Sequence, residues 1–178
     1  NSKWIGNLVA SAKSHLKTPT WDVPGTKKGS LGCASAVSII FYRAFGVSLR
    51  NGKAVKEIPR KISDFGSKGT GVLAGDFKNK SLFQQIPLKD GQPGDIVNTA
   101  RNGSTGKAGH IGIIIDIKHK NGSWVIISNS SGGFAGGGGG AIKKNYSIAA
   151  WEKGVTPRNP SQTFAYRYIG PKLSSQIA

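Results

Sequence analysis

Residues 32–46, GCASAVSIIFYRAFG, predict the central helix of the chain and thereby decide its fold. The apolar side chains of this segment give the helix a face wide enough to be largely buried: Ala34, Ala36, Val37, Ile40, Phe41, Ala44 and Phe45. Gly46 stands where a glycine commonly ends a helix in the left-handed conformation. Cys33 lies in the first turn, where the helix dipole and unpaired N–H groups stabilise a thiolate and lower the thiol pKa. We therefore expect a nucleophilic cysteine at the start of a buried helix.

A cysteine nucleophile needs a base, and the chain offers three histidines. His15 lies near the end of a predicted helix and His119 lies in a basic run beside a turn, so both are expected at the surface. His110 begins the most apolar predicted strand, in which isoleucine recurs at every second position over 111–117. Gly109 is expected to leave space beside this imidazole. His110 is therefore the candidate base.

A third residue is expected to orient the imidazole through its other ring nitrogen. An Asn-Gly dipeptide at 121–122 predicts a two-residue hairpin turn after the His110 strand. In the register that follows from this turn, Ser131 faces Gly112, and Asn129 lies on the same side of the sheet as His110. Asn129 is our choice for the third residue, and Ser131 stays open as the alternative.

The rest of the chain predicts a second helix, further strands and glycine-rich loops. These elements are a helix over 3–16, a loop over 20–31, a basic and mostly irregular excursion over about 50–89 with a short element at 82–86, strands beginning at 95, at 124 and at 164, and a flexible loop over 132–140. Helices and an antiparallel sheet in this arrangement predict an α+β fold. We expect a single catalytic domain over 1–178, with its core over about 3–170.

The composition limits the classes of function. The 178 residues carry a net charge of +17, which favours an anionic partner over a neutral one. The cations are scattered and not interleaved with aromatic residues, so a nucleic-acid interface is not expected. No apolar run approaches the roughly 18 residues that a membrane span requires. The one cysteine excludes an internal disulfide and a cysteine-based zinc site.

Three stretches resemble papain-like cell-wall hydrolases of the NlpC/P60 and CHAP families. SAKSHLKTPTWDVPGTKKGSLGCASAVSIIFYRAFGVSL (11–49) is similar to the start of an NlpC/P60 domain, which leads through a helix and a loop into the catalytic cysteine. LKDGQPGDIV (88–97) and GHIGIII (109–115) resemble the segments before and at the catalytic histidine. The hairpin ending in Ile127-Ser128-Asn129 is closer to CHAP amidases. The chain has Ala34-Ser35 where the NlpC/P60 family usually has Ser-Gly.

The resemblance implies a papain-like fold and a cysteine hydrolase that cleaves amide bonds in peptidoglycan peptides. Cys33 is then the nucleophile, His110 the base and Asn129 the orienting residue, with no metal or cofactor. The implied partner is peptidoglycan or another anionic wall polymer, and the protein is expected to act as a monomer, secreted or carried by a phage particle. Two alternatives stay open: an acyltransferase or transglutaminase with the same residues, and a polyanion-binding module without catalysis.

Overall fold

The computed structural model describes residues 5–19, 23, 32–54, 69–117, 124–129 and 140–173, and the fold is α+β. The described helices are α1 (Ile5–Ser14), α2 (Cys33–Phe45), α4 (Gly69–Asp76) and α5 (Ile148–Gly154). The strands are β1 (Phe83–Ile86), β2 (Ile96–Thr99), β3 (His110–Ile114), β4 (Ile126–Asn129), β5 (Ile142–Tyr146) and β6 (Thr163–Tyr168). They form one antiparallel sheet in the order β1-β6-β2-β3-β4-β5. Three short 3-10 helices complete the description: η4 (Leu88–Asp90), η5 (Thr156–Arg158) and η6 (Pro160–Gln162).

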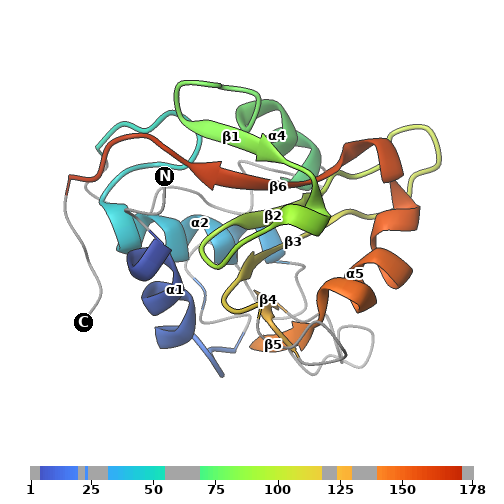
Figure 1. Cartoon of the computed structure of the whole chain (residues 1–178), viewed down its shortest axis with the longest axis horizontal. Helices are drawn as coiled ribbons and strands as arrows, with labels where there is room; N and C mark the ends of the chain where they lie inside the picture. The colour runs from blue at the N-terminus through green and yellow to red at the C-terminus, as the bar shows by residue number, and fades with distance from the viewer. Residues whose placement is uncertain are drawn as a thin grey trace.

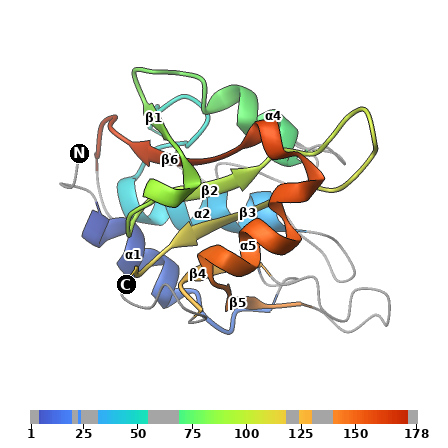
Figure 2. The same cartoon turned by 45° about the vertical axis from the view of Figure 1, so that its right-hand side comes forward.

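Different helices cover the two faces of the sheet. Helix α1 packs beside α2 (Figure 1), whereas α5 lies on the opposite side of β3 and β4 from α2 (Figure 2). Ile111 and Ile113 belong to the core cluster that holds the apolar side chains of α2. Ile114 and Ile126 belong instead to the cluster around Trp151 of α5. Because successive strand residues point to opposite faces, this division tells which helix each residue of β3 and β4 faces.

Helix α2 forms as predicted, and ten of its 13 residues are buried. Gly46 ends it in the left-handed conformation, with φ of 73°, and donates its N–H to the carbonyl of Tyr42. Phe41 and Phe45 pack edge to face with ring centroids 4.8 Å apart, and both contact Tyr168 of β6. Burying each aromatic ring contributes about 1.5–3 kcal/mol, so the apolar face of α2 holds the helix firmly on the sheet.

Several elements differ from the prediction. The excursion over 50–89 was expected to be mostly irregular, but it contains α4, whose sequence GTGVLAGD carries two internal glycines that weaken any helix signal. Strand β5 and helix α5 were not predicted at all. Ser147 caps α5, because its side chain accepts a hydrogen bond from the N–H of Ala150. His15, expected at the surface, is buried, with only 6% of the residue exposed.

The hairpin of β3 and β4 has a different register from the prediction. Ser128 faces Gly112, where the predicted turn put Ser131, so the pairing is shifted by three residues. An odd shift exchanges the two faces of the returning strand. Ser128 therefore lies on the side of His110, and Asn129 lies on the side of α2. Residues 118–123, which include the Asn-Gly dipeptide, and Ser131 are outside the described residues.

Candidate active site

Cys33 begins α2 and packs against the core on the α2 side of the sheet. Burial raises the pKa of its thiol to about 11, although backbone N–H groups of Ala34, Ile111 and Cys33 itself act to lower it. The N–H groups at the helix start act to lower the thiol pKa, as the sequence predicted. Desolvation of the buried thiol raises this pKa by a larger amount. At neutral pH the resting sulfur is a protonated thiol, and the residue is partly exposed.

His110 is the first residue of β3 and pairs with Thr99 of β2. Its ring stacks on the buried indole of Trp151, with centroids 5.2 Å apart and planes 23° apart, and it also contacts Tyr146 at 5.6 Å. The indole is itself fixed, because Nε1 of Trp151 donates to Oγ1 of Thr99 at 3.0 Å. The imidazole is therefore held on the α5 side of the sheet.

Two consecutive hydrogen bonds orient this imidazole. Nε2 of His110 lies 2.9 Å from the hydroxyl of Ser128, and that hydroxyl donates to Oδ1 of Asn145 at 2.7 Å. Since a serine hydroxyl has one proton, its oxygen must accept the hydrogen bond from His110. The proton of the neutral imidazole is thus on Nε2, and Nδ1 carries the lone pair that a general base needs.

The environment of His110 keeps the imidazole neutral. Burial lowers the pKa of His110 to about 4, and the charge of Arg158 adds to this effect. Nη1 of Arg158 also reaches the carbonyl of Ala108, two residues before His110, at 3.5 Å. The imidazole is therefore unprotonated above about pH 4, and the lowered pKa also makes it a weaker base than an ordinary histidine.

Cys33 and His110 meet at the same end of β3 but from opposite sides of the strand. The thiol is close enough to the N–H of Ile111 for that group to lower its pKa, whereas the imidazole packs on Trp151. Within the described residues, no hydrogen bond joins the sulfur to the imidazole. The structure thus brings the two predicted residues to one place without forming a direct pair.

Asn129 is buried on β4 opposite Ile142, next to Ser128. The imidazole partner is Ser128, which sequence reasoning missed together with Asn145, Trp151 and Arg158. A correct register would have found Ser128, because its face follows from its pairing with Gly112 alone.

Glycines near the imidazole serve close packing and do not leave open space, which corrects a further expectation. A side chain at Gly109 would collide with Thr70 and with the carbonyl of Thr99. At Gly112 a side chain would meet Ile126 and Ser128. The candidate site is therefore tightly packed around β3.

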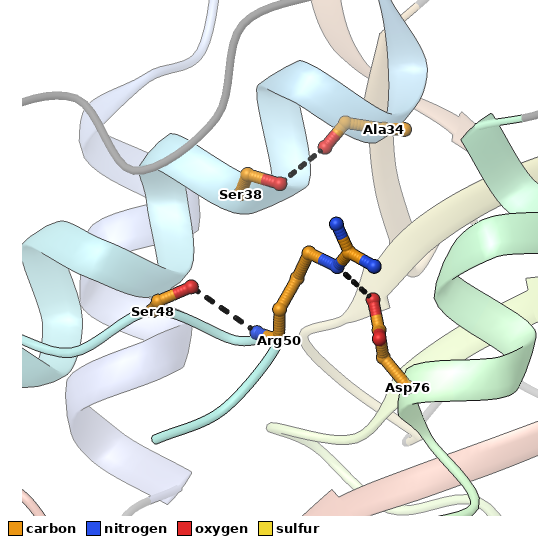
Figure 3. Close-up of polar contacts among 5 residues, drawn as sticks. All are labelled: Ala34, Ser38, Ser48, Arg50 and Asp76. Atoms are coloured by element: carbon orange, nitrogen blue, oxygen red, sulfur yellow. Dashed lines mark hydrogen bonds and ion pairs between the residues drawn. The ribbon is translucent and has the colours of Figure 1, made fainter. Parts of the chain in front are cut away.

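Polar contacts fix the helices beside the site. Oγ of Ser38 donates to the carbonyl of Ala34 in the first turns of α2, and Nε of Arg50 donates to the carboxylate of Asp76 at the end of α4 (Figure 3). At its other end, α4 is joined to β2, because the carbonyl of Thr70 accepts from Nδ2 of Asn98 at 3.2 Å. Helix α4 is thus tied to the segment after α2 and to the sheet.

Comparison with protein-family models, curated proteins and solved structures gives no match to the chain. The likeness to NlpC/P60 and CHAP domains therefore rests on the motifs and their order. In the described part of the chain, no helix has the length and apolar character to span a membrane. The described residues also contain no group of His, Cys, Asp or Glu side chains that could hold a metal ion.

Proposed function

We propose that the protein is a papain-like cysteine hydrolase that cleaves amide bonds in peptidoglycan peptides. The observation that carries the proposal is the orientation of His110 by Ser128 and Asn145, under the cover of Trp151, at the end of β3 that Cys33 also reaches. With its proton on Nε2, His110 has the lone pair of a base on Nδ1. The motif order from Cys33 to His110 and the net charge of +17 support a wall substrate.

The proposed reaction begins with transfer of the thiol proton of Cys33 to Nδ1 of His110. The thiolate attacks the amide carbonyl, and backbone N–H groups at the start of α2 stabilise the oxyanion. His110 then protonates the leaving amine, which leaves a thioester on Cys33. Water, deprotonated by His110, hydrolyses the thioester and restores the thiol.

Proton transfer requires Nδ1 and the sulfur to come together when substrate binds. The imidazole is stacked on Trp151 and hydrogen-bonded to Ser128, so a direct transfer requires it to leave this position. One bridging water would serve equally well, since catalytic hydrogen bonds often tighten only in the substrate complex.

A binding module without catalysis is the second candidate. The high pKa of the Cys33 thiol and the lack of a hydrogen bond from it to His110, among the described residues, favour this reading. An acyltransferase would use the same residues with an amine in place of water.

Digestion of purified peptidoglycan, followed by mass spectrometry of the soluble fragments, tests the proposal. We expect new amine and carboxyl ends with the wild-type protein and none with Cys33→Ala or His110→Ala. Melting temperatures of the variants serve as folding controls. Wall binding without any cleaved product would favour the binding module, and fragments joined to an added amine would favour the acyltransferase.

A further inference from the structure

A cavity of about 560 Å³ lies beside β1, which is the outermost strand of the sheet (Figure 1). Phe77 and Phe83 form an apolar floor, with their rings packed edge to face and the centroids 4.9 Å apart. Ile169 also lines the cavity, and 40% of this residue is exposed. Strand β1 is three positions from β3 in the sheet, a distance of about 14 Å. The cavity is therefore separate from the candidate active site.

The rest of the lining is basic or neutral. Lys78 and Lys80 come from the connection between α4 and β1, and Gln84 and Gln85 come from β1 itself. None of the lining residues is acidic. Both lysines are exposed, and neither takes part in an ion pair within the described residues. A molecule that matches this cavity combines an apolar group with acidic groups.

The strand pairing turns backbone groups of β1 toward the open edge. The N–H of Ile169 donates to the carbonyl of Leu82, so these two residues form a hydrogen-bonded pair of the antiparallel ladder. Such pairs alternate along the strand, and the next one joins Gln84 to Arg167. The N–H and carbonyl of Gln85 therefore face away from β6. In the part of the chain that the structure describes, neither group has a hydrogen-bond partner.

The open part of this edge is short. The N–H of Phe83 already donates to the carbonyl of Asn79 at 2.9 Å, and Pro87, which follows the strand, has no N–H. An added strand therefore pairs with β1 mainly at Gln85. With so few backbone hydrogen bonds, most of the affinity must come from side chains in the cavity and at the two lysines.

We propose that β1 binds an extended segment of a partner protein, which pairs with Gln85 as an added strand. The segment places an apolar side chain in the cavity and pairs acidic side chains with Lys78 and Lys80. A second copy of this chain is a poor match, because it brings the same lysines and a net charge of +17 to the edge. A ligand without a peptide backbone makes no use of the outward groups of Gln85. The inference does not depend on the proposed function.

NMR titration of the full chain with a short, end-blocked peptide of alternating valine and glutamate tests the proposal. Alternation places the valines on one face of the extended peptide and the glutamates on the other. We expect a Kd below about 1 mM, with shifts centred on the amide of Gln85 and the methyl groups of Ile169. The same peptide with N-methylated backbone nitrogens should not bind, and a valine–lysine peptide should bind at least about tenfold more weakly. Absence of shifts at Gln85, or equal binding of either control peptide, would overturn the inference.

Charge variants test the role of the two lysines. Lys78→Gln/Lys80→Gln should weaken binding of the valine–glutamate peptide by about tenfold. Lys143→Gln/Lys144→Gln is the matched control, because it removes two exposed lysines from β5 at the other edge of the sheet. This control should bind the peptide as the wild type does. Equal weakening in both double variants would reduce the effect to net charge and contradict a site at β1.

Proline variants test the role of the backbone. Gln85→Pro removes the outward N–H without removing a hydrogen bond to β6, so it should abolish peptide binding with little change in melting temperature. Gln84→Pro removes an inward N–H and should lower the melting temperature. Should Gln85→Pro fail to fold, the N-methylated peptide tests the same hydrogen bond from the other side. Full peptide binding by folded Gln85→Pro would overturn the inference. Sedimentation of the free protein as a dimer that Gln85→Pro abolishes would also overturn it, because the edge would then belong to a second copy.

Discussion

The hydroxyl of Ser128 holds Nε2 of His110 at 2.9 Å across neighbouring strands. The two residues share one face of the sheet, because Ser128 pairs with Gly112 and side chains alternate along β3. Oδ1 of Asn145 accepts a hydrogen bond from the hydroxyl, so the hydroxyl oxygen accepts the hydrogen bond from the imidazole. In the proposed reaction Ser128 is therefore a positioning residue that acts through His110.

Ser128→Ala should lower kcat by about tenfold to hundredfold with little change in KM, because it removes a hydrogen bond to an imidazole that becomes charged during the reaction. Ser128→Thr keeps a hydroxyl and should recover part of the rate. The acid limb of the pH–rate profile should shift in Ser128→Ala, which a merely structural role would not cause. Asn129→Ala is the matched control on the same strand and should have the smaller effect. If Asn129→Ala is the slower enzyme, Asn129 orients the imidazole as the sequence first indicated.

Alkylation of Cys33 should report the protonation state of its thiol. Because burial raises the pKa of Cys33 to about 11, iodoacetamide should react slowly at pH 7 and faster with each step toward pH 11. The native state should also lose stability between pH 9 and 11, since the unfolded thiol ionises near 9.0 and the folded thiol does not. Rapid labelling with a midpoint below pH 8 would show that the N–H groups around the sulfur outweigh its burial. Cys33→Ser provides the unlabelled control.

The sequence predicted well the parts of the fold that local patterns determine. Helix α2 follows from its apolar face and from Gly46, and both strands of the central hairpin follow from their isoleucines. The α+β class was confirmed for the same reason. Elements whose stability comes from tertiary contacts were missed. Helix α4 has two internal glycines, and its ends are held by Asn98 and Arg50 from distant parts of the chain.

The sequence indicated which chain segments form the candidate site, but it did not indicate which residues form hydrogen bonds with His110. Cys33 and His110 reach the same end of β3, as the motif order implied. The choice of Asn129 depended on a turn that fixed the register, and an error of three residues there exchanged the two faces of β4. The position of Cys33 at a helix start led to the expectation of a low thiol pKa. The burial that raises this pKa comes from packing against other segments, so it cannot be seen in one segment.

A buried ion pair should matter more to stability than a partly exposed one. Asp95 is fully buried, and its carboxylate accepts two hydrogen bonds from Arg167, both at 2.9 Å. Arg167→Ala leaves that carboxylate without its cation and should lower the free energy of unfolding by about 3 kcal/mol. Arg50→Ala breaks the more exposed pair with Asp76 and should cost less than about 1 kcal/mol. Urea unfolding of both variants measures the difference, and equal losses would contradict this ranking.

The salt dependence of the reaction rates should distinguish electrostatic attraction to the cell wall from catalysis. If the net charge of +17 guides the enzyme to an anionic wall, lysis of intact cells should fall steeply between low and physiological salt. Hydrolysis of a small uncharged model amide should change little, because it depends only on Cys33 and His110. The ratio of the two rates, measured at several salt concentrations, tests this. Equal salt dependence would assign the charge to solubility alone.

The titration of His110 should set the acid limit of activity and contribute to acid unfolding. Burial, with the charge of Arg158, lowers the pKa of His110 to about 4, against 6.5 for an ordinary histidine. The imidazole should therefore remain unprotonated down to about pH 4, and the rate of the proposed reaction should fall below that value. Between pH 6.5 and 4 the unfolded chain takes up a proton that native His110 does not, so stability should decrease as pH falls through this window.

His15, whose pKa burial also lowers, acts in the same direction. Histidine NMR titrations and melting temperatures of the wild type, His110→Gln and His15→Gln separate the contributions of the two residues. His110→Gln should reduce the pH dependence of stability and abolish turnover. His15→Gln should also reduce the pH dependence of stability but keep turnover. A His110 that titrates near 6.5 would contradict the buried, stacked position against Trp151.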